Sequence, residues 1–281
     1  MTYRKARETA GLLLKQSGVE NEAAESWFLM EYVCGIDRSF YLLHQQEEMP
    51  EAERESYEKL VRKRCQRIPL QHLTGGQEFM GLFFQVNEHV LIPRQDTEIL
   101  AESALKILKG CKNAKILDLC TGSGCIAVSM KAYAEECTVD GCDISEQALR
   151  VAEKNAALNH ADVKFIRSDL FLEIHETYDM IVSNPPYIPS GVIATLMPEV
   201  REHEPIGALD GGEDGLYFYR EIIRQSGEYL KPVGYLLFEI GCDQGASVSE
   251  MMKKYGFDEI EVIPDLAGLD RVVKGRRRKN V

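Results

Sequence analysis

The stretch K-I-L-D-L-C-T-G-S-G, residues 115–124, decides the fold of this 281-residue chain. A short apolar run leads into a turn with two glycines, and a helical pattern follows. Glycines at such a turn let the backbone approach a ligand, while the N–H groups of the following helix point outward. A dinucleotide-binding turn reads G-x-G-x-x-G, whereas this one reads D-x-x-T-G-S-G. The difference favours a ligand that lacks a pyrophosphate.

Strands and helices alternate beyond residue 114. We predict strands over residues 115–120, 138–143, 163–166, 180–183 and 234–240, and helices near 124–134, 145–158, 214–230 and 244–254. This alternation indicates a Rossmann-like α/β fold, with a mostly parallel sheet covered by helices on both faces. No helix separates the last two strands, 257–262 and 271–273, so we expect an antiparallel hairpin at the edge of the sheet.

The N-terminal quarter of the chain has a helical pattern throughout. Apolar residues recur at three- and four-residue intervals between Leu12 and Leu43, and Asn21, Asp37 and Pro50 are typical of helix starts. Four or five short helices are predicted over residues 1–74, as a small helical bundle.

A hinge and a β-hairpin are predicted over residues 75–93, where Gly75-Gly76 interrupts the helical pattern. The hairpin comprises residues 78–80 and 83–86 around Gly81. The catalytic domain is then expected over 94–281, beginning with a helix capped by Asp96 with Glu98 in its first turn.

Composition and charge limit the possible function classes. The chain is 44% hydrophobic, has no apolar run of membrane-spanning length and lacks an N-terminal signal pattern, so we expect a cytoplasmic protein with no membrane partner. Its eight cysteines show no zinc-ligand spacing, which predicts reduced thiols and no metal site. We expect a monomer.

The net charge of −12 is unevenly distributed. Residues 1–74 contain 11 basic and 12 acidic side chains, whereas the rest contains 22 basic and 33 acidic ones. Because nucleic acids are bound through phosphate neutralisation, no direct nucleic-acid partner is expected. Two basic clusters, within 59–67 and 276–279, are interpreted as solvated faces, with docking to a partner or to ribosomal RNA as the alternative.

Acidic residues follow the second and third predicted strands of the sheet. Asp143 can accept both hydroxyls of a ribose, and Asp169 is placed for the amino group of an adenine. Together with the turn after the first strand, they suggest S-adenosylmethionine, a nucleoside with a charged amino acid and no phosphate. Asp118 alone also fits a structural carboxylate that faces a helix. The predicted cofactor-binding residues are Asp118, Cys120, Thr121, Gly122, Ser123, Gly124, Asp143, Asp169, Leu170 and Asn184.

The motif Asn184-Pro185-Pro186-Tyr187 ends the fourth strand of the sheet. The two prolines lack N–H groups and stiffen the backbone. An Asn side chain and a neighbouring carbonyl can accept both hydrogens of an NH2 group, and the Tyr ring offers a flat face. We predict that Asn184, Pro185 and Tyr187 are catalytic and that all four residues bind the substrate nitrogen. A tight turn after a strand is the simpler alternative.

Over nearly its full length, the chain resembles the peptide chain release factor glutamine methyltransferases, the PrmC/HemK family. Besides N-P-P-Y, the resemblance lies in residues 68–72, 78–82, 91–94, 204–205, 208–212, 214–216, 218–220, 239–241 with Gln244, and 265–268 with 270–271. Two positions depart from the family pattern. Gln95 replaces the usual proline, which would loosen the start of the next helix, and Cys120 replaces the usual glycine, which is tolerable if its side chain points away from the cofactor.

The resemblance implies a substrate, the glutamine of the Gly-Gly-Gln motif in class-one peptide chain release factors. It implies methylation of the side-chain nitrogen by S-adenosylmethionine, in translation termination. The chain's own Gly75-Gly76-Gln77 is interpreted as a hinge that matches this motif by coincidence.

Three alternatives remain at this point. An adenine amino-methyltransferase of DNA or RNA shares N-P-P-Y but needs a basic surface and a flipped base. A ribosomal-protein glutamine methyltransferase would differ mainly in the N-terminal half. A non-enzymatic adaptor that keeps the cofactor fold is the third.

Overall fold

The computed structural model describes residues 1–279 and contains two compact units. One, the helical unit, comprises Met1–Gly76 and Met197–His203, and the other, the sheet unit, comprises Gln77–Leu196 and the chain from Glu204 onward. The long N-terminal piece of the helical unit ends within two residues of the predicted boundary at 74. The short second piece was not foreseen, because it lies within the predicted catalytic domain.

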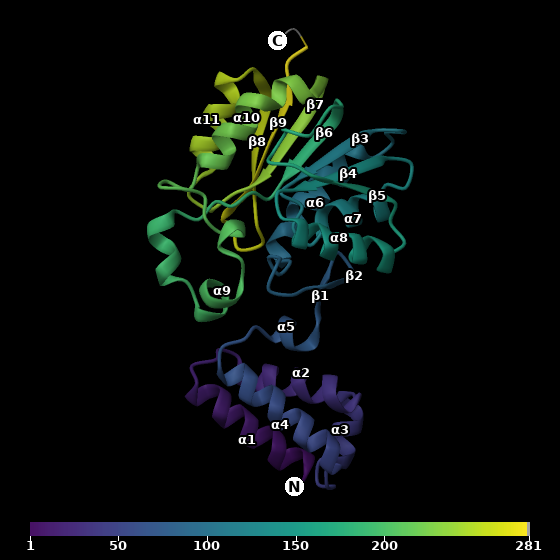
Figure 1. The fold of residues 1–281 in the computed structure, drawn as a ribbon, viewed down its shortest axis with the longest axis vertical. Helices are drawn as coiled ribbons and strands as arrows, with labels where there is room; N and C mark the ends of the chain where they lie inside the picture. The colour runs from purple at the N-terminus through teal and green to yellow at the C-terminus, as the bar shows by residue number, and fades with distance from the viewer. Residues whose placement is uncertain (280–281) are drawn as a thin grey trace. The chain divides into compact units, whose positions relative to one another are not determined.

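The helical unit contains the predicted bundle (Figure 1). Its helices are α1 (Tyr3–Gln16), α2 (Glu22–Cys34), α3 (Arg38–His44), α4 (Glu51–Cys65) and α5 (Leu70–Thr74). Asn21, Asp37 and Pro50 precede α2, α3 and α4 as their N-cap residues, as expected. Burial of apolar side chains such as Leu14, Trp27 and Met30 stabilises the bundle.

The short helix α9 (Pro198–His203) belongs to the helical unit because a buried carboxylate attaches it there. Glu199 accepts hydrogen bonds from Arg64 Nη2 at 2.8 Å, Arg67 Nε at 2.7 Å and Arg67 Nη2 at 2.5 Å. Arg64 also pairs with Glu25 of α2. Residues that are far apart in sequence are thereby held in one charged cluster.

The sheet unit is built on a seven-stranded sheet with the order β5-β4-β3-β6-β7-β9-β8. These strands are β3 (Lys115–Leu119), β4 (Thr138–Asp143), β5 (Val163–Arg167), β6 (Tyr178–Ser183), β7 (Leu230–Glu239), β8 (Phe257–Pro264) and β9 (Asp270–Arg277). The strands from β5 to β7 are parallel, whereas β9 is antiparallel to both β7 and β8. The predicted parallel sheet with an antiparallel edge hairpin is confirmed.

Helices cover both faces of the sheet, as Figure 1 shows. Apolar side chains of α6 (Gln95–Leu108) and α7 (Cys125–Tyr133) pack in one core, on the face where α8 (Glu146–Leu158) also lies. Those of α10 (Tyr217–Tyr229) and α11 (Gly245–Lys254) pack in a second core. Neighbouring residues of one strand, such as Ile116 and Leu117, enter opposite cores because strand side chains alternate.

The remaining elements are short. The hairpin β1 (Gly76–Phe79) and β2 (Leu82–Gln85) confirms the predicted strand pair, and Asn155 of α8 bonds the backbone of Gln85. Two 3-10 turns, η1 (Ser190–Thr195) and η2 (Ile206–Ala208), flank α9 in sequence. No helix among residues 1–279 is long and apolar enough to cross a membrane.

The start of α6 corrects one prediction. The helix begins at Gln95, so Asp96 is a first-turn residue rather than the cap, and its carboxylate lies 3.3 Å from Arg271 Nη2. Gln95 therefore occupies the first helical position, which proline favours, and the extended backbone of Arg94 (φ −102°, ψ 147°) suits a residue before proline. Both facts explain why the family usually has proline at position 95. In this chain α6 begins at the same position with Gln95 instead.

Candidate active site

A cavity of about 470 Å³ lies at the carboxyl ends of β3, β4 and β6. Strand order reverses between β3 and β6, and ligands of open α/β sheets bind at such a point. Leu119 of β3 pairs with Ser183 of β6 and with Cys142 of β4. This register puts Cys120 beside both Asn184 and Asp143, so the three predicted strand ends meet at one place.

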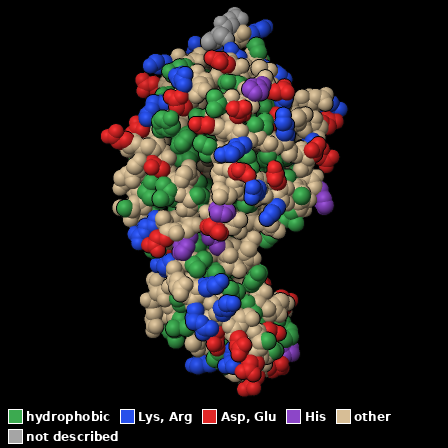
Figure 2. Space-filling model, in the orientation of Figure 1, with side chains coloured by type: hydrophobic (Ala, Val, Ile, Leu, Met, Phe, Trp, Pro, Cys, Tyr) green, Lys and Arg blue, Asp and Glu red, His purple; other side chains and the backbone are tan. Residues whose placement is uncertain are grey.

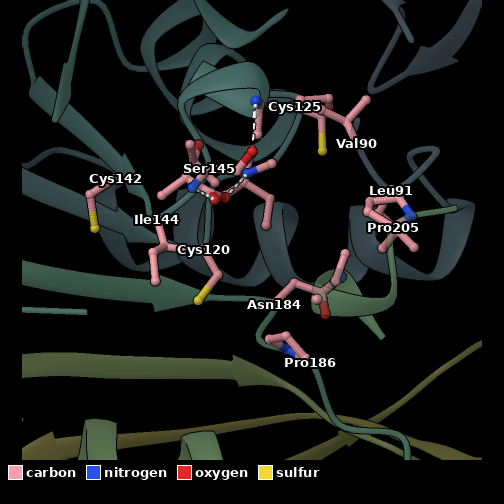
Figure 3. Close-up of a pocket in the computed structure, with 18 of the residues that line it drawn as sticks. Val90, Leu91, Cys120, Cys125, Cys142, Ile144, Ser145, Asn184, Pro186 and Pro205 are labelled. Atoms are coloured by element: carbon pink, nitrogen blue, oxygen red, sulfur yellow. Dashed lines mark hydrogen bonds between the residues drawn. The ribbon is translucent and has the colours of Figure 1, made fainter. Parts of the chain in front are cut away.

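Figure 3 shows Cys120 between Ile144 and Asn184 in the wall of this cavity. Cys120 has φ 60°, a left-handed conformation that costs a residue other than glycine about 1–2 kcal/mol. The family's glycine at this position is explained by that backbone conformation. Cys120 lines the cavity, so the departure from the family's glycine puts a side chain near the predicted cofactor site. Burial raises the pKa of its thiol well above the ordinary value.

The rest of the turn divides into residues that line the cavity and one that does not. Thr121, Gly122 and Ser123 line it. Gly124 is absent from its wall and has φ 80°, and a Cβ there would lie 3.0 Å from the Cβ of Ala152. Gly124 thus permits close packing of α7 on α8, which is a structural role.

Asp118 also supports the turn from behind. It is fully buried, does not line the cavity, and accepts hydrogen bonds from Thr121 Oγ1 at 2.6 Å and Ala127 N at 3.1 Å. These contacts favour the structural alternative for Asp118. Burial raises its pKa to about 7, although both hydrogen bonds act in the opposite direction.

Asp118 should make the protein less stable as pH rises. Its folded pKa lies above the unfolded value of 3.8, so the folded state binds more protons between those values and the free energy of unfolding falls. Between pH 5 and 6.5 the free energy of unfolding should therefore fall by about 2 kcal/mol more in the parent than in Asp118→Asn. Urea denaturation of parent and variant at both pH values measures it, and equal pH dependence in the two proteins would contradict it.

Asp143 lines the cavity and is fixed by the backbone around it. Its Oδ2 accepts from Gly122 N and its Oδ1 from Ser145 N, each at 2.9 Å. Burial raises the pKa of Asp143, and these hydrogen bonds oppose the rise. Asp169 and Leu170 line the same cavity beyond β5. The carboxylates predicted for ribose and adenine are thus both on its wall.

Within N-P-P-Y, the structure separates the four residues. Asn184 and Pro186 line the cavity, whereas Pro185 and Tyr187 are absent from its wall. The Tyr187 hydroxyl lies 3.2 Å from Glu239 Oε1 at the end of β7, and Gln244 Nε2 donates to the Tyr187 carbonyl at 3.0 Å. Tyr187 therefore holds the motif in place here, and its predicted packing against a substrate amide stays a prediction.

Several wall residues were not named as site residues from the sequence. Among them are Arg94, which pairs with the buried Glu204 at 2.6 Å, and Thr97 in the first turn of α6. Pro205 and Phe218 are others. Arg94, Pro205 and Phe218 fall in segments that resemble the family, and this resemblance was the signal by which they could have been predicted. Thr97 lies outside those segments.

Comparison with known proteins agrees with this geometry. Residues 5–75 match the family described as PrmC N-terminal domain, and residues 95–197 match the methyltransferase small domain. A release factor glutamine methyltransferase of Geobacter sulfurreducens is 41% identical, covering 98% of this chain and 96% of its own length. One from Clostridium acetobutylicum is 42% identical, covering 93% of each.

Two solved structures share the fold of the sheet unit. A methyltransferase from Pyrococcus furiosus aligns over 71% of this chain and 91% of its own, with a TM-score of 0.53 at 17% identity. A Thermus thermophilus 16S rRNA N2 G1207 methyltransferase, in complex with AdoMet and guanosine, aligns over 72% and 50%, with a TM-score of 0.52 at 14% identity.

Proposed function

This chain belongs to the release factor glutamine methyltransferases, and we propose that it methylates the glutamine of the Gly-Gly-Gln motif in class-one release factors, with S-adenosylmethionine as methyl donor. The observation that carries the site assignment is the adjacency of Cys120 and Asn184 at the strand-order reversal. A methyl donor seated on the 120–123 turn would have its reacting end beside Asn184.

Positioning is the main task of such a site, since an amide nitrogen shares its lone pair with the carbonyl and is a poor nucleophile. Asn184 Oδ1 and the Pro185 carbonyl would each accept one hydrogen of the substrate NH2 group. That arrangement aligns the nitrogen with the sulfonium methyl and stabilises positive charge as it develops on nitrogen. Held by the 120–123 turn and Asp143, S-adenosylmethionine would supply the methyl group, its S–CH3 bond breaking as the N–CH3 bond forms, and the nitrogen would release one proton to water.

Mass spectrometry of a purified class-one release factor incubated with the protein and S-adenosylmethionine tests the function. We expect a gain of one methyl group, located on the Gly-Gly-Gln glutamine. No gain on the factor while the cofactor still binds would refute this substrate.

Asp143→Ala should mainly weaken binding of S-adenosylmethionine, because Asp143 is the carboxylate proposed to accept the ribose hydroxyls. The expected loss is about tenfold to hundredfold in affinity, comparable to the loss of hydrogen bonds with a charged group. Isothermal titration with the cofactor measures it, and an unchanged dissociation constant would refute the ribose role.

A nucleic-acid substrate is less well supported. On the face of the sheet unit shown in Figure 2, Lys and Arg side chains are interspersed with Asp and Glu. Such a surface does not provide the basic stripe that phosphate binding uses. We therefore propose a protein substrate. We also propose that the enzyme is monomeric and acts in the cytoplasm.

The helical unit is proposed to bind the release factor away from the glutamine. Its surface exposes several large apolar side chains, such as Leu12 at 61%, Leu42 at 67% and Leu43 at 81%. Leu42 and Leu43 are neighbours on α3, and adjoining exposed apolar side chains of this kind support a protein interaction site. Deleting the bundle is a poor test, because Glu199 would lose Arg64 and Arg67.

The double variant Leu42→Glu/Leu43→Glu should raise KM for the release factor about tenfold, since charges would replace apolar contacts. The dissociation constant for S-adenosylmethionine should not change. Leu266→Glu, at a fully exposed leucine of the sheet unit, is the matched control. Steady-state kinetics measure the effect, and equal KM values in the two variants would exclude this surface.

A further inference from the structure

Two buried side chains, Thr97 and Glu239, lie next to Asn184. Asn184 Nδ2 lies 3.3 Å from Thr97 Oγ1 and donates to it. Thr97 belongs to the first turn of α6 and is 2% exposed. Burial raises the pKa of the Glu239 carboxyl, and an interaction with the Thr97 side chain acts in the opposite direction, which indicates that the Thr97 hydroxyl lies near that carboxyl.

Glu239 is placed beside Asn184 by the strand register. Ser183 of β6 pairs with Phe238 of β7, so the next residue of each strand is Asn184 and Glu239. Glu239 is 2% exposed, and its Oε1 accepts from the Tyr187 hydroxyl at 3.2 Å. Its buried Oε2 has no hydrogen-bond partner among residues 1–279, so this oxygen has the capacity to accept the Thr97 hydrogen.

The number of hydrogens that each group can donate determines which group is the donor in each of these contacts. A carboxylate only accepts, and a hydroxyl has one hydrogen to donate. If Thr97 gives its hydrogen to Glu239, it can only accept from Asn184, so the NH2 group of Asn184 must face Thr97. The oxygen of Asn184 then faces the substrate.

We propose that Glu239 and Thr97 are positioning residues that fix the orientation of the Asn184 amide, so that its oxygen and not its NH2 group meets the substrate nitrogen. The inference rests on the proposed glutamine methylation. A flipped Asn184 would point donors at the donors of the substrate amide and would misplace the nitrogen. Neither Glu239 nor Thr97 takes part in the methyl transfer itself.

Thr97→Val keeps the size of the side chain without the hydroxyl, and Thr97→Ser keeps the hydroxyl without the methyl group. Valine removes the hydroxyl and should lower kcat about tenfold to hundredfold, the range seen when partners of a functional side chain are removed. Serine keeps the hydroxyl and should restore kcat to within about threefold of the parent. Ser103→Ala removes another buried hydroxyl from the same helix and should leave kcat unchanged. The dissociation constant for S-adenosylmethionine should stay within about twofold in all three, since the cofactor side of the cavity is untouched.

Glu239→Gln tests the direction. Its NH2 group can donate to Thr97, which frees the threonine hydrogen for the Asn184 oxygen and permits the flipped amide. A release factor with Glu in place of the motif glutamine offers only acceptors, so it should bind the flipped amide better. The ratio of its inhibition constant to KM should therefore be about tenfold lower for Glu239→Gln than for the parent. A role limited to stability would not change this ratio.

The outcomes separate the two proposals. If the parent methylates the factor but Thr97→Val is as active, or Thr97→Ser is no better than Thr97→Val, the orientation role is wrong and the function stands. If the parent does not methylate the factor, the function itself fails. A folded Glu239→Gln with the inhibition ratio of the parent would also overturn the proposed direction.

Discussion

Replacing Asn184 with alanine is expected to lower kcat for release factor methylation on the order of 10²–10³-fold, as for loss of one preorganised electrostatic partner. Asn184 lies at the end of β6 beside the 120–123 turn, and its amide is held by Thr97. Alanine removes the oxygen that would accept a substrate hydrogen and leaves only the backbone carbonyl of Pro185. The nitrogen would then sample orientations in which its lone pair does not face the methyl group.

Single-turnover kinetics at saturating S-adenosylmethionine measure this loss without interference from cofactor affinity or product release. The melting temperature should change little, because Asn184 lines a cavity and is not part of the packed core. Turnover within a few-fold of the parent would refute the role of Asn184 as acceptor and would shift attention to backbone groups of the motif.

Much of the fold follows from local patterns. The predicted strand over 138–143 matches β4, and the strand ends at Asp143 and Ser183 are placed correctly. Ser183 ends a buried apolar run, which is typical of a strand in a parallel sheet. Since all parallel strands end at one edge, the sequence also brings together the Gly-rich turn, Asp143 and Asn184.

The failures have physical causes that local patterns do not contain. The capping pattern put the helix start at Asp96, but that carboxylate pairs with Arg271, which is 175 positions away. The inclusion of α9 in the helical unit depends on a salt bridge between Glu199 and arginines more than 130 positions earlier. Thr97 belongs to no recognised motif, and only its contact with Asn184 in the structure points to the positioning role that we propose.

In the helical unit, periodicity indicated helices but not which residues are buried. Leu12 and Leu13 belong to the apolar pattern and are exposed, whereas the neighbouring Leu14 is fully buried. Adjacent apolar residues on a helix point about 100° apart, so a run of three leucines cannot all face one core. The surplus apolar residues are the ones we propose for partner binding.

The second large effect concerns the stability of the helical unit. Glu199→Gln should lower its free energy of unfolding by about 3 kcal/mol, the lower end of the range for breaking a buried ion pair. The Glu199 side chain is 11% exposed and that of Arg64 is 5% exposed, so two guanidinium groups would lose a carboxylate with little water to replace it. The lower end applies because Arg64 keeps Glu25.

Two controls make this prediction specific. Glu202→Gln, on the same helix, breaks an exposed pair with Arg201 and should cost less than about 1 kcal/mol. Burial alone would raise the pKa of Glu199, but hydrogen bonds from Arg67 and Arg64 prevail and lower it to about 2 from 4.5. Its stabilising effect is therefore complete above about pH 4.5 and is lost as pH falls toward 2. Urea denaturation should show the gap between parent and Glu199→Gln shrinking between pH 5 and 3. A gap that stays constant over that interval would mean that lost packing, and not lost charge, separates the two proteins.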